Sequence, residues 1–146
     1  MIDKYNLQRF VSAQEEQYAD AISELKSGKK KTHWMWFIFP QIKGLGHSAI
    51  AQHYAIESLD EAREYLYHPL LGARLKECTL AVLNMKGRNT KDIFGHPDYL
   101  KFHSCMTLFA EIEEEDSLFE AALSKYYEDQ PDDATLSILQ TIESLT

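Results

Sequence analysis

The sequence predicts an all-α fold, a compact single domain of residues 1–146 with about seven or eight short helices that do not form a simple up-down bundle. Apolar residues recur along the chain at intervals of three and four, as they do on the buried face of a helix. No stretch alternates polar and apolar residues as a strand does. A length of 146 residues, with 45% hydrophobic and 26% charged residues, is typical of one globular domain.

The first two helices lead into the segment on which our hypothesis about a site rests. We expect a helix over residues 7–27, stopped by Gly28, because the apolar spacing ends there and a glycine follows. Thr32 can cap a short helix at Trp34–Phe39. That segment is apolar on every side, so we expect it to be buried, and Pro40 ends it.

Capping residues, prolines and glycines delimit the remaining helices. Ser48 can cap a helix that runs to about Tyr54, and Ser58 and Glu61 have the spacing of a capping box. Ser117 can cap an amphipathic helix further along the chain. Because the expected helices are unequal in length, they do not suit a simple up-down bundle. Beyond Tyr54, they are expected at residues 58–67, 69–87, 90–94, 97–112, 118–126 and 133–144.

Charge is distributed unevenly along the chain. The formal net charge of −8 argues against a general affinity for nucleic acid or for acidic membranes. No acidic residue lies between Glu24 and Glu57, and five lysines give that interval a charge of +5, against −13 for the rest of the chain. The interval is either a solvated lysine run after a helix or a source of positive potential for an anionic ligand.

The composition also bears on the compartment and on metal binding. The two cysteines, Cys78 and Cys105, make no disulfide framework and have no metal-ligand spacing, which suits a reducing, cytoplasmic location. The first residues contain no apolar signal sequence, and no apolar run is long enough to span a membrane. We predict no metal site, no cofactor and no membrane partner.

The aromatic segment provides the first candidate ligand contacts. Both tryptophans of the chain, Trp34 and Trp36, lie in it. Buried aromatic rings mostly serve core packing, but an indole that borders a cleft can stack on a planar ligand. Helical spacing places Trp34 and Trp36 on different sides of the helix, so at most one or two rings of the segment can line a pocket.

The turn after Pro40 has the composition of an anion-binding loop. Glycines let the backbone approach a ligand, a lysine supplies charge, and the helix that follows offers free N–H groups at its start. The same residues also suit an ordinary turn with a capping serine. The candidate binding residues of this turn are Gln41, Lys43, Gly44, Gly46 and Ser48.

A second segment, the start of the helix predicted at 97–112, provides further candidates. His33 and Asp98 are the candidate catalytic residues, because an imidazole and a carboxylate can transfer protons without a metal. Lys101 and Ser104 are candidate ligand contacts. Asp98 and Lys101 are three residues apart, so they can instead pair with each other along the helix.

Three stretches carry a resemblance to a known family: HWMWFIFPQIKGLGHS, YAIESLDEAREYLYHPLLGARLKEC and IFGHPDYLKFHSCMTLFA. The chain resembles the bacterial and plant-associated domain of unknown function numbered eighteen-ten, whose members are often labelled "calpastatin". This resemblance implies a single, mainly helical, cytoplasmic domain and no defined activity. Calpain inhibition does not fit the sequence, because inhibitors of that name are disordered repeats of low hydrophobicity and this chain has 12% aromatic residues and no repeats.

The sequence leaves three functional hypotheses. The first is a protein that binds a small anionic ligand, such as a nucleotide, in a cleft between His33–Ser48 and Asp98–Ser104, either as a binding protein or as a metal-independent hydrolase or N-glycosidase. The second is a protein-interaction module that uses an exposed Trp34–Phe39. The third, binding of nucleic acid through the lysine-rich turn, is the least favoured because the rest of the chain is acidic. Whether the chain is an enzyme or forms a homodimer stays open.

Overall fold

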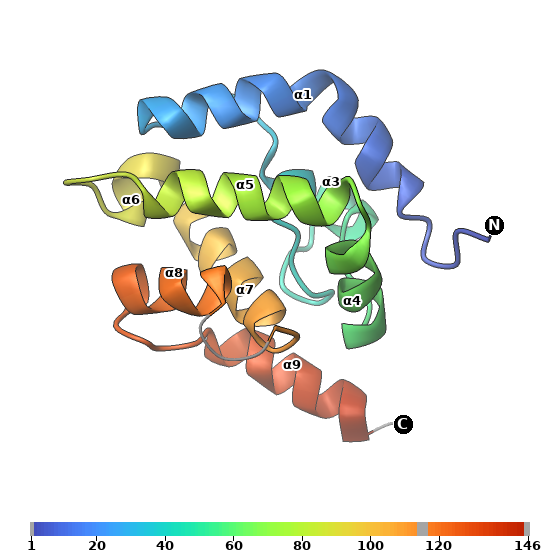
Figure 1. Cartoon of the computed structure of the whole chain (residues 1–146). Coiled ribbons are helices and arrows are strands. Elements are labelled where there is room, and N and C mark those ends of the chain that lie inside the picture. Colours follow the sequence, from blue (N-terminus) through green and yellow to red (C-terminus); the bar gives the residue numbers. More distant parts are fainter. Residues whose placement is uncertain (1, 114–116, 145–146) are drawn as a thin grey trace.

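The computed structural model describes residues 2–113 and 117–144, and over these residues it confirms the all-α prediction (Figure 1). The described residues contain no strand, only one isolated parallel bridge between Ile42 and Ile56. The helices of the described residues number nine, slightly more than the total of about seven or eight expected, and each lies where the sequence predicts a helix. The helices are α1 Gln8–Ser27, α2 Met35–Ile38, α3 Ala49–His53, α4 Leu59–Tyr67, α5 Leu71–Leu83, α6 Thr90–Phe94, α7 Asp98–Ala110, α8 Leu118–Tyr127 and α9 Asp133–Ser144.

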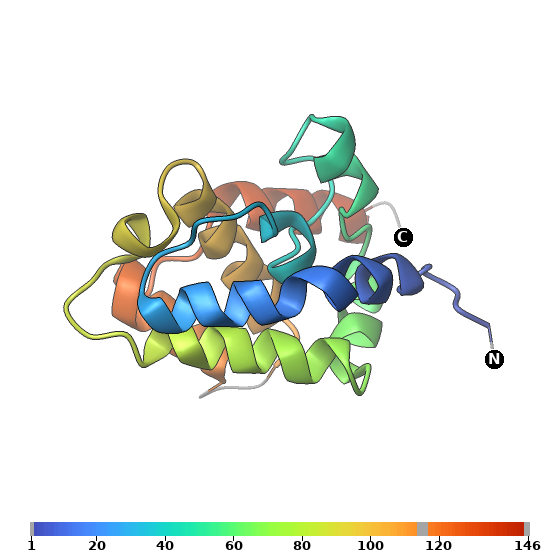
Figure 2. The ribbon, with the colours of Figure 1, turned by 90° about the horizontal axis from the view of Figure 1, so that it is seen from above.

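Two long helices, α1 and α5, lie side by side and run in the same direction (Figures 1 and 2). Their C-terminal ends and α6 therefore lie together at one end of the molecule, on the left in both views. Helix α7 packs against α8, which also contacts α5, and against α9 (Figure 1). This is not a simple up-down bundle, because the helices differ in length and cross at steep angles.

Helix α7 lies at the centre of the hydrophobic core. Phe102 and every residue from Ser104 to Phe109 are buried, which agrees with a helix that is apolar on several sides. Phe39, just after α2, packs edge-on against Phe94 of α6 and Phe102 of α7, with ring centroids 5.7 and 5.0 Å apart. The aromatic segment is thereby fixed against the start of α7, as the ligand-binding hypothesis requires.

Local sequence signals set most helix ends. Gly28 adopts a φ of +86° and ends α1, and Ser48, Ser58 and Ser117 cap α3, α4 and α8 with their hydroxyl oxygens. The expected cap at Thr32 is wrong, because no side chain caps α2 and the Thr32 hydroxyl donates to Glu24 instead.

The helix expected at 69–87 is shorter than predicted. It begins at Leu71 and ends at Leu83, with Asn84 as the C-terminal cap. His68 caps the start of α5, because its Nδ1 accepts hydrogen bonds from the backbone N–H groups of Leu70 and Leu71. None of the helices in the described part of the chain is both long and apolar enough to cross a bilayer.

Candidate functional site

Glu24, near the end of α1, organises the lysine-rich loop. Glu24 is 9% exposed, and its carboxylate accepts four hydrogen bonds from the chain that follows Gly28. The donors are the Lys31 and Thr32 backbone N–H groups at 2.6 and 2.8 Å, the Thr32 hydroxyl at 2.6 Å and the Trp34 indole N–H at 3.0 Å. Burial alone would raise the pKa of Glu24, but the hydrogen bonds from Thr32, Lys31 and Trp34 outweigh it and lower that pKa to about 2.

The loop that Glu24 holds places Lys30 against the start of α7. The Lys30 backbone N–H donates to the Ile93 carbonyl at 2.7 Å, and its ammonium lies 2.9 Å from an Asp98 carboxylate oxygen. The second Asp98 oxygen lies 3.2 Å from the ammonium of Lys101. The side chains of Lys30, Asp98 and Lys101 are 8%, 18% and 23% exposed, so this triad is largely shielded from water and carries a net charge of +1.

The two tryptophans of the aromatic segment have different environments. Trp34 is completely buried, and the Lys30 ammonium lies 5.1 Å from its ring centroid. Trp36 is only half-buried, and the Lys101 ammonium lies 5.1 Å from its ring centroid. Each ring thus has a cation–π contact with one lysine of the triad, but only Trp36 keeps part of its indole accessible to a ligand.

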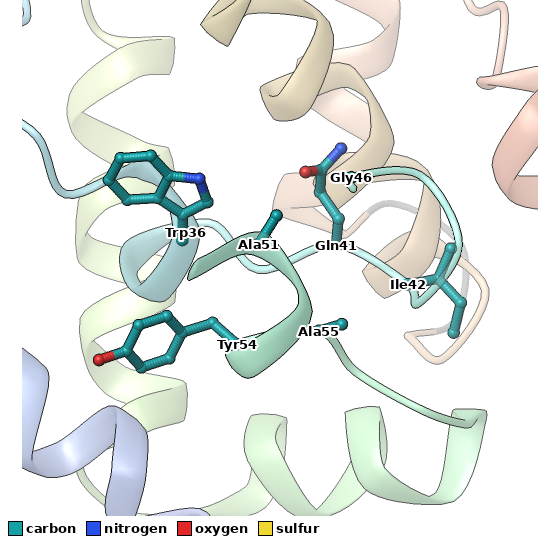
Figure 3. A pocket seen from close by; sticks show the side chains of 7 residues that line it. All are labelled: Trp36, Gln41, Ile42, Gly46, Ala51, Tyr54 and Ala55. Atoms are coloured by element: carbon teal, nitrogen blue, oxygen red, sulfur yellow. The ribbon is translucent and has the colours of Figure 1, made fainter. Parts of the chain in front are cut away.

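A small hollow lies beside Trp36, between α2, α3 and the turn after Pro40 (Figure 3). Trp36 and Gln41 lie on opposite rims of it, with Ala51 between them in this view. Its cavity volume is about 10 Å³, which is roughly enough for one water molecule. No residue of Asp98–Ser104 lines this hollow, so it is not the cleft predicted between the two segments, and a nucleotide bound here would lie over the rim.

The glycine turn has a structural explanation. A Cβ on Gly46 would lie 2.6 Å from the Ala51 Cβ, so the absence of a side chain allows the turn to approach α3. Gly44 has a φ of +110° and lies against Ile138 of α9. The Ser48 hydroxyl accepts from the Ala51 N–H, so it acts as a helix cap.

Other predicted site residues point elsewhere. Lys43 lies in the solvent, 3.5 Å from Glu57, with a 62% exposed side chain. The Ser104 hydroxyl donates to Asp132 at 3.2 Å and to the Leu100 carbonyl at 3.1 Å, so Ser104 faces α9 and not the aromatic segment. His33 is exposed, while the ionic partners of Asp98 within the described residues are both lysines.

Comparison with known proteins identifies the family. A family model described as "protein of unknown function (DUF1810)" matches residues 4–139. The chain belongs to this family. The crystal structure of the conserved hypothetical protein Rv1873 from Mycobacterium tuberculosis has a similar fold, with a TM-score of 0.93. The two are 48% identical, and the match covers 94% of this chain and 99% of that one. No curated protein matches the chain.

Two residues of this candidate site were not predicted from the sequence. Lys30 was part of a lysine run with no distinguishing feature, and Glu24 was only the boundary of the acid-free interval. Their roles depend on contacts between α1, the following loop and α7, which no local pattern reports. Asp98 and Lys101 were identified, including their pairing along the helix, because that contact spans one turn.

Proposed function

We propose that this chain binds a small anionic ligand with a planar group at the surface formed by Trp36, Gln41 and Lys101. The observation that carries the proposal is the Lys101 ammonium beside the half-buried Trp36 indole. An aromatic face next to a positive charge is suited to a base or similar ring that bears a phosphate. The proposal covers a nucleotide or a comparable phosphate-bearing molecule.

Polar groups around this surface support the proposal. The Gln41 side-chain amide and the Trp36 indole N–H have no hydrogen-bond partner among the described residues, so both can contact a ligand. Among the described residues, Lys101 and Lys30 share one carboxylate, that of Asp98, which leaves one positive charge in excess. Such an excess in a partly shielded site attracts a phosphate more strongly than an isolated surface lysine does.

The proposal is limited to binding. The hydrolase and N-glycosidase alternatives relied on His33 and Asp98 acting together, and each Asp98 oxygen is instead next to a lysine. The protein-interaction alternative required an exposed apolar patch at Trp34–Phe39. All of that segment except Trp36 is buried, so it presents no such patch.

Isothermal titration with ADP, adenosine and pyrophosphate tests the proposal. ADP carries both the ring and the phosphates, so we expect it to bind more tightly than either fragment. Lys101→Ala and Trp36→Ala should each weaken ADP binding by about tenfold or more, since a charged hydrogen bond or a stacked base contributes about 1–3 kcal/mol. Lys4→Ala, which removes an exposed lysine at the chain start, is the matched control. The absence of binding by all three ligands, or an equal loss in the control, would contradict the proposal.

A further inference from the structure

Positive charge is concentrated at the end of the molecule where α1 and α5 terminate. The residues that carry it come from two segments that are far apart in the sequence. We define the basic end as residues 24–33 and 84–101. It contains eight basic residues against three acidic ones, a net charge of +5. The rest of the chain, with seven basic and 20 acidic residues, carries −13. The eight basic residues are Lys26, Lys29, Lys30, Lys31, Lys86, Arg88, Lys91 and Lys101.

Specific contacts hold these two segments together. A Cβ placed on Gly28 would lie 3.1 Å from Arg88 Nε, so the loop after α5 covers the end of α1. The backbone of Lys30 donates to the Ile93 carbonyl of α6, and its ammonium pairs with Asp98. Figures 1 and 2 show the C-terminal ends of α1 and α5 beside α6 from two directions.

Most of this charge is not neutralised within the protein. The acidic residues of the basic end are all engaged: Glu24 accepts four hydrogen bonds, Asp92 closes a capping box, and Asp98 lies between two lysines. Besides Lys26 in the last turn of α1, five of the cations are exposed and have no carboxylate within ion-pair distance among the described residues. They are Lys29, Lys31, Lys86, Arg88 and Lys91.

Helix dipoles explain only part of this distribution. Lys26 lies in the last turn of α1, and Lys125 of α8 donates to the carbonyls of Leu83 and Met85 at the end of α5. Lys29, Lys86 and Arg88 lie beyond the ends of α1 and α5, and their side chains bond no helix carbonyl among the described residues, whereas Lys91 lies within α6. Holding them together in a chain of net charge −8 costs free energy through mutual repulsion, which an anionic partner would relieve.

We infer that the basic end binds the phosphate backbone of a single-stranded nucleic acid. The aromatic side chains beside these cations favour this partner over an acidic polypeptide. Tyr99 is half-buried with the Lys91 ammonium 5.8 Å from its ring centroid, and His96 next to it is exposed. Rings interleaved with cations suit unstacked bases and phosphates, whereas carboxylates would use the cations alone. The inference goes beyond the proposed function, because it requires cations at residues 86–91 that lie outside the Trp36 surface.

Fluorescence anisotropy with a labelled 12-nucleotide single-stranded RNA of mixed sequence tests the inference. With five exposed cations neutralised, affinity should fall about a hundredfold between 50 and 200 mM salt. The double variant Lys86→Ala/Arg88→Ala should bind RNA at least about tenfold more weakly than the parent at 50 mM salt. Between 50 and 200 mM salt, the RNA affinity of this variant should fall only about twentyfold, because it neutralises fewer phosphates. Lys4→Ala/Arg63→Ala removes one lysine and one arginine elsewhere on the surface and should bind as the parent does.

Two measurements separate this inference from the proposed function. ADP binding should be unchanged in the Lys86→Ala/Arg88→Ala variant, whereas RNA binding should weaken at least about tenfold. No RNA binding at 50 mM salt, an equal affinity in the two double variants, or displacement of RNA by an equal concentration of a 12-residue polyglutamate would each overturn the inference. If RNA binds as expected and ADP does not bind, the proposed function fails and the inference stands.

Discussion

Replacing Glu24 with glutamine should destabilise the protein, because this carboxylate holds the loop that presents Lys30. The four donors converge on a group that is 9% exposed. Glutamine keeps one acceptor oxygen but loses the negative charge and places an NH₂ group among donors. The fold should survive, since the glutamine side chain has nearly the same volume.

The pKa of Glu24 gives the magnitude of this effect. A fall of the pKa from its ordinary 4.5 to about 2 corresponds to about 3 kcal/mol in favour of the folded state. The folded-state pKa is the lower one, so this stabilisation is complete above about pH 4.5 and disappears as the pH falls through about 2. At pH 3, roughly half of it remains.

Urea unfolding of the parent and of Glu24→Gln at pH 7 and pH 3 measures the effect. We expect a difference in unfolding free energy of about 3 kcal/mol at pH 7, equivalent to about 10 °C in melting temperature, and about half that difference at pH 3. Glu16→Gln, an exposed glutamate on the same helix, should change the unfolding free energy by less than about 0.5 kcal/mol. A difference below about 1 kcal/mol at pH 7, or one that does not shrink at pH 3, would refute this account of Glu24.

Three further predictions follow from single positions. Gly72→Ala should cost about 3 kcal/mol in urea unfolding or prevent folding, because its Cβ would lie 1.9 Å from a carbonyl oxygen of α4; a cost below about 1 kcal/mol would contradict that contact. Asp98→Asn should lower the unfolding free energy by about 2 kcal/mol, because it leaves the shielded Lys30 without its carboxylate, yet it should tighten ADP binding. If both stability and ADP affinity fall, the positive charge of the triad does not attract ADP. Burial raises the pKa of Cys78 to about 12 and that of Cys105 well above its usual range, so neither thiol should react with Ellman's reagent at pH 8 until urea unfolds the chain.

The sequence was most informative where one residue and its near neighbours determine the structure. Gly28, Ser48, Ser58 and Ser117 were all identified as helix boundaries, because a cap bonds to backbone groups within four residues. The predicted cap at Thr32 was wrong, because its hydroxyl donates to the charged carboxylate of Glu24, eight residues earlier in the chain.

The site was only partly accessible from sequence. Helical spacing separated Trp34 from Trp36 but could not tell which one is buried, because that depends on the Glu24 carboxylate of another helix. Ser104 was assigned to the aromatic segment although it faces α9, since the direction of a central helix relative to its neighbours is a tertiary property.

The second half of the basic end carried a signal that was missed. No acidic residue lies between Glu77 and Asp92, just as none lies between Glu24 and Glu57. Nothing local relates these two intervals, because they meet only when α1 and α5 pack side by side. Acid-free intervals are therefore worth comparing in pairs when helices of similar direction are expected.

The most direct test of the proposed ligand surface uses the two indole N–H signals that this chain gives in a ¹H–¹⁵N correlation spectrum. Trp36→Phe assigns them, since one signal disappears in that variant. On titration with ADP, we expect the Trp36 signal to shift in a saturable way, while the signal of Trp34, whose N–H is bonded to Glu24 in the core, stays in place. In Lys101→Ala, the same shift should need at least about tenfold more ADP. A Trp36 signal that does not move at millimolar ADP, or that moves equally in Lys101→Ala, would contradict the account.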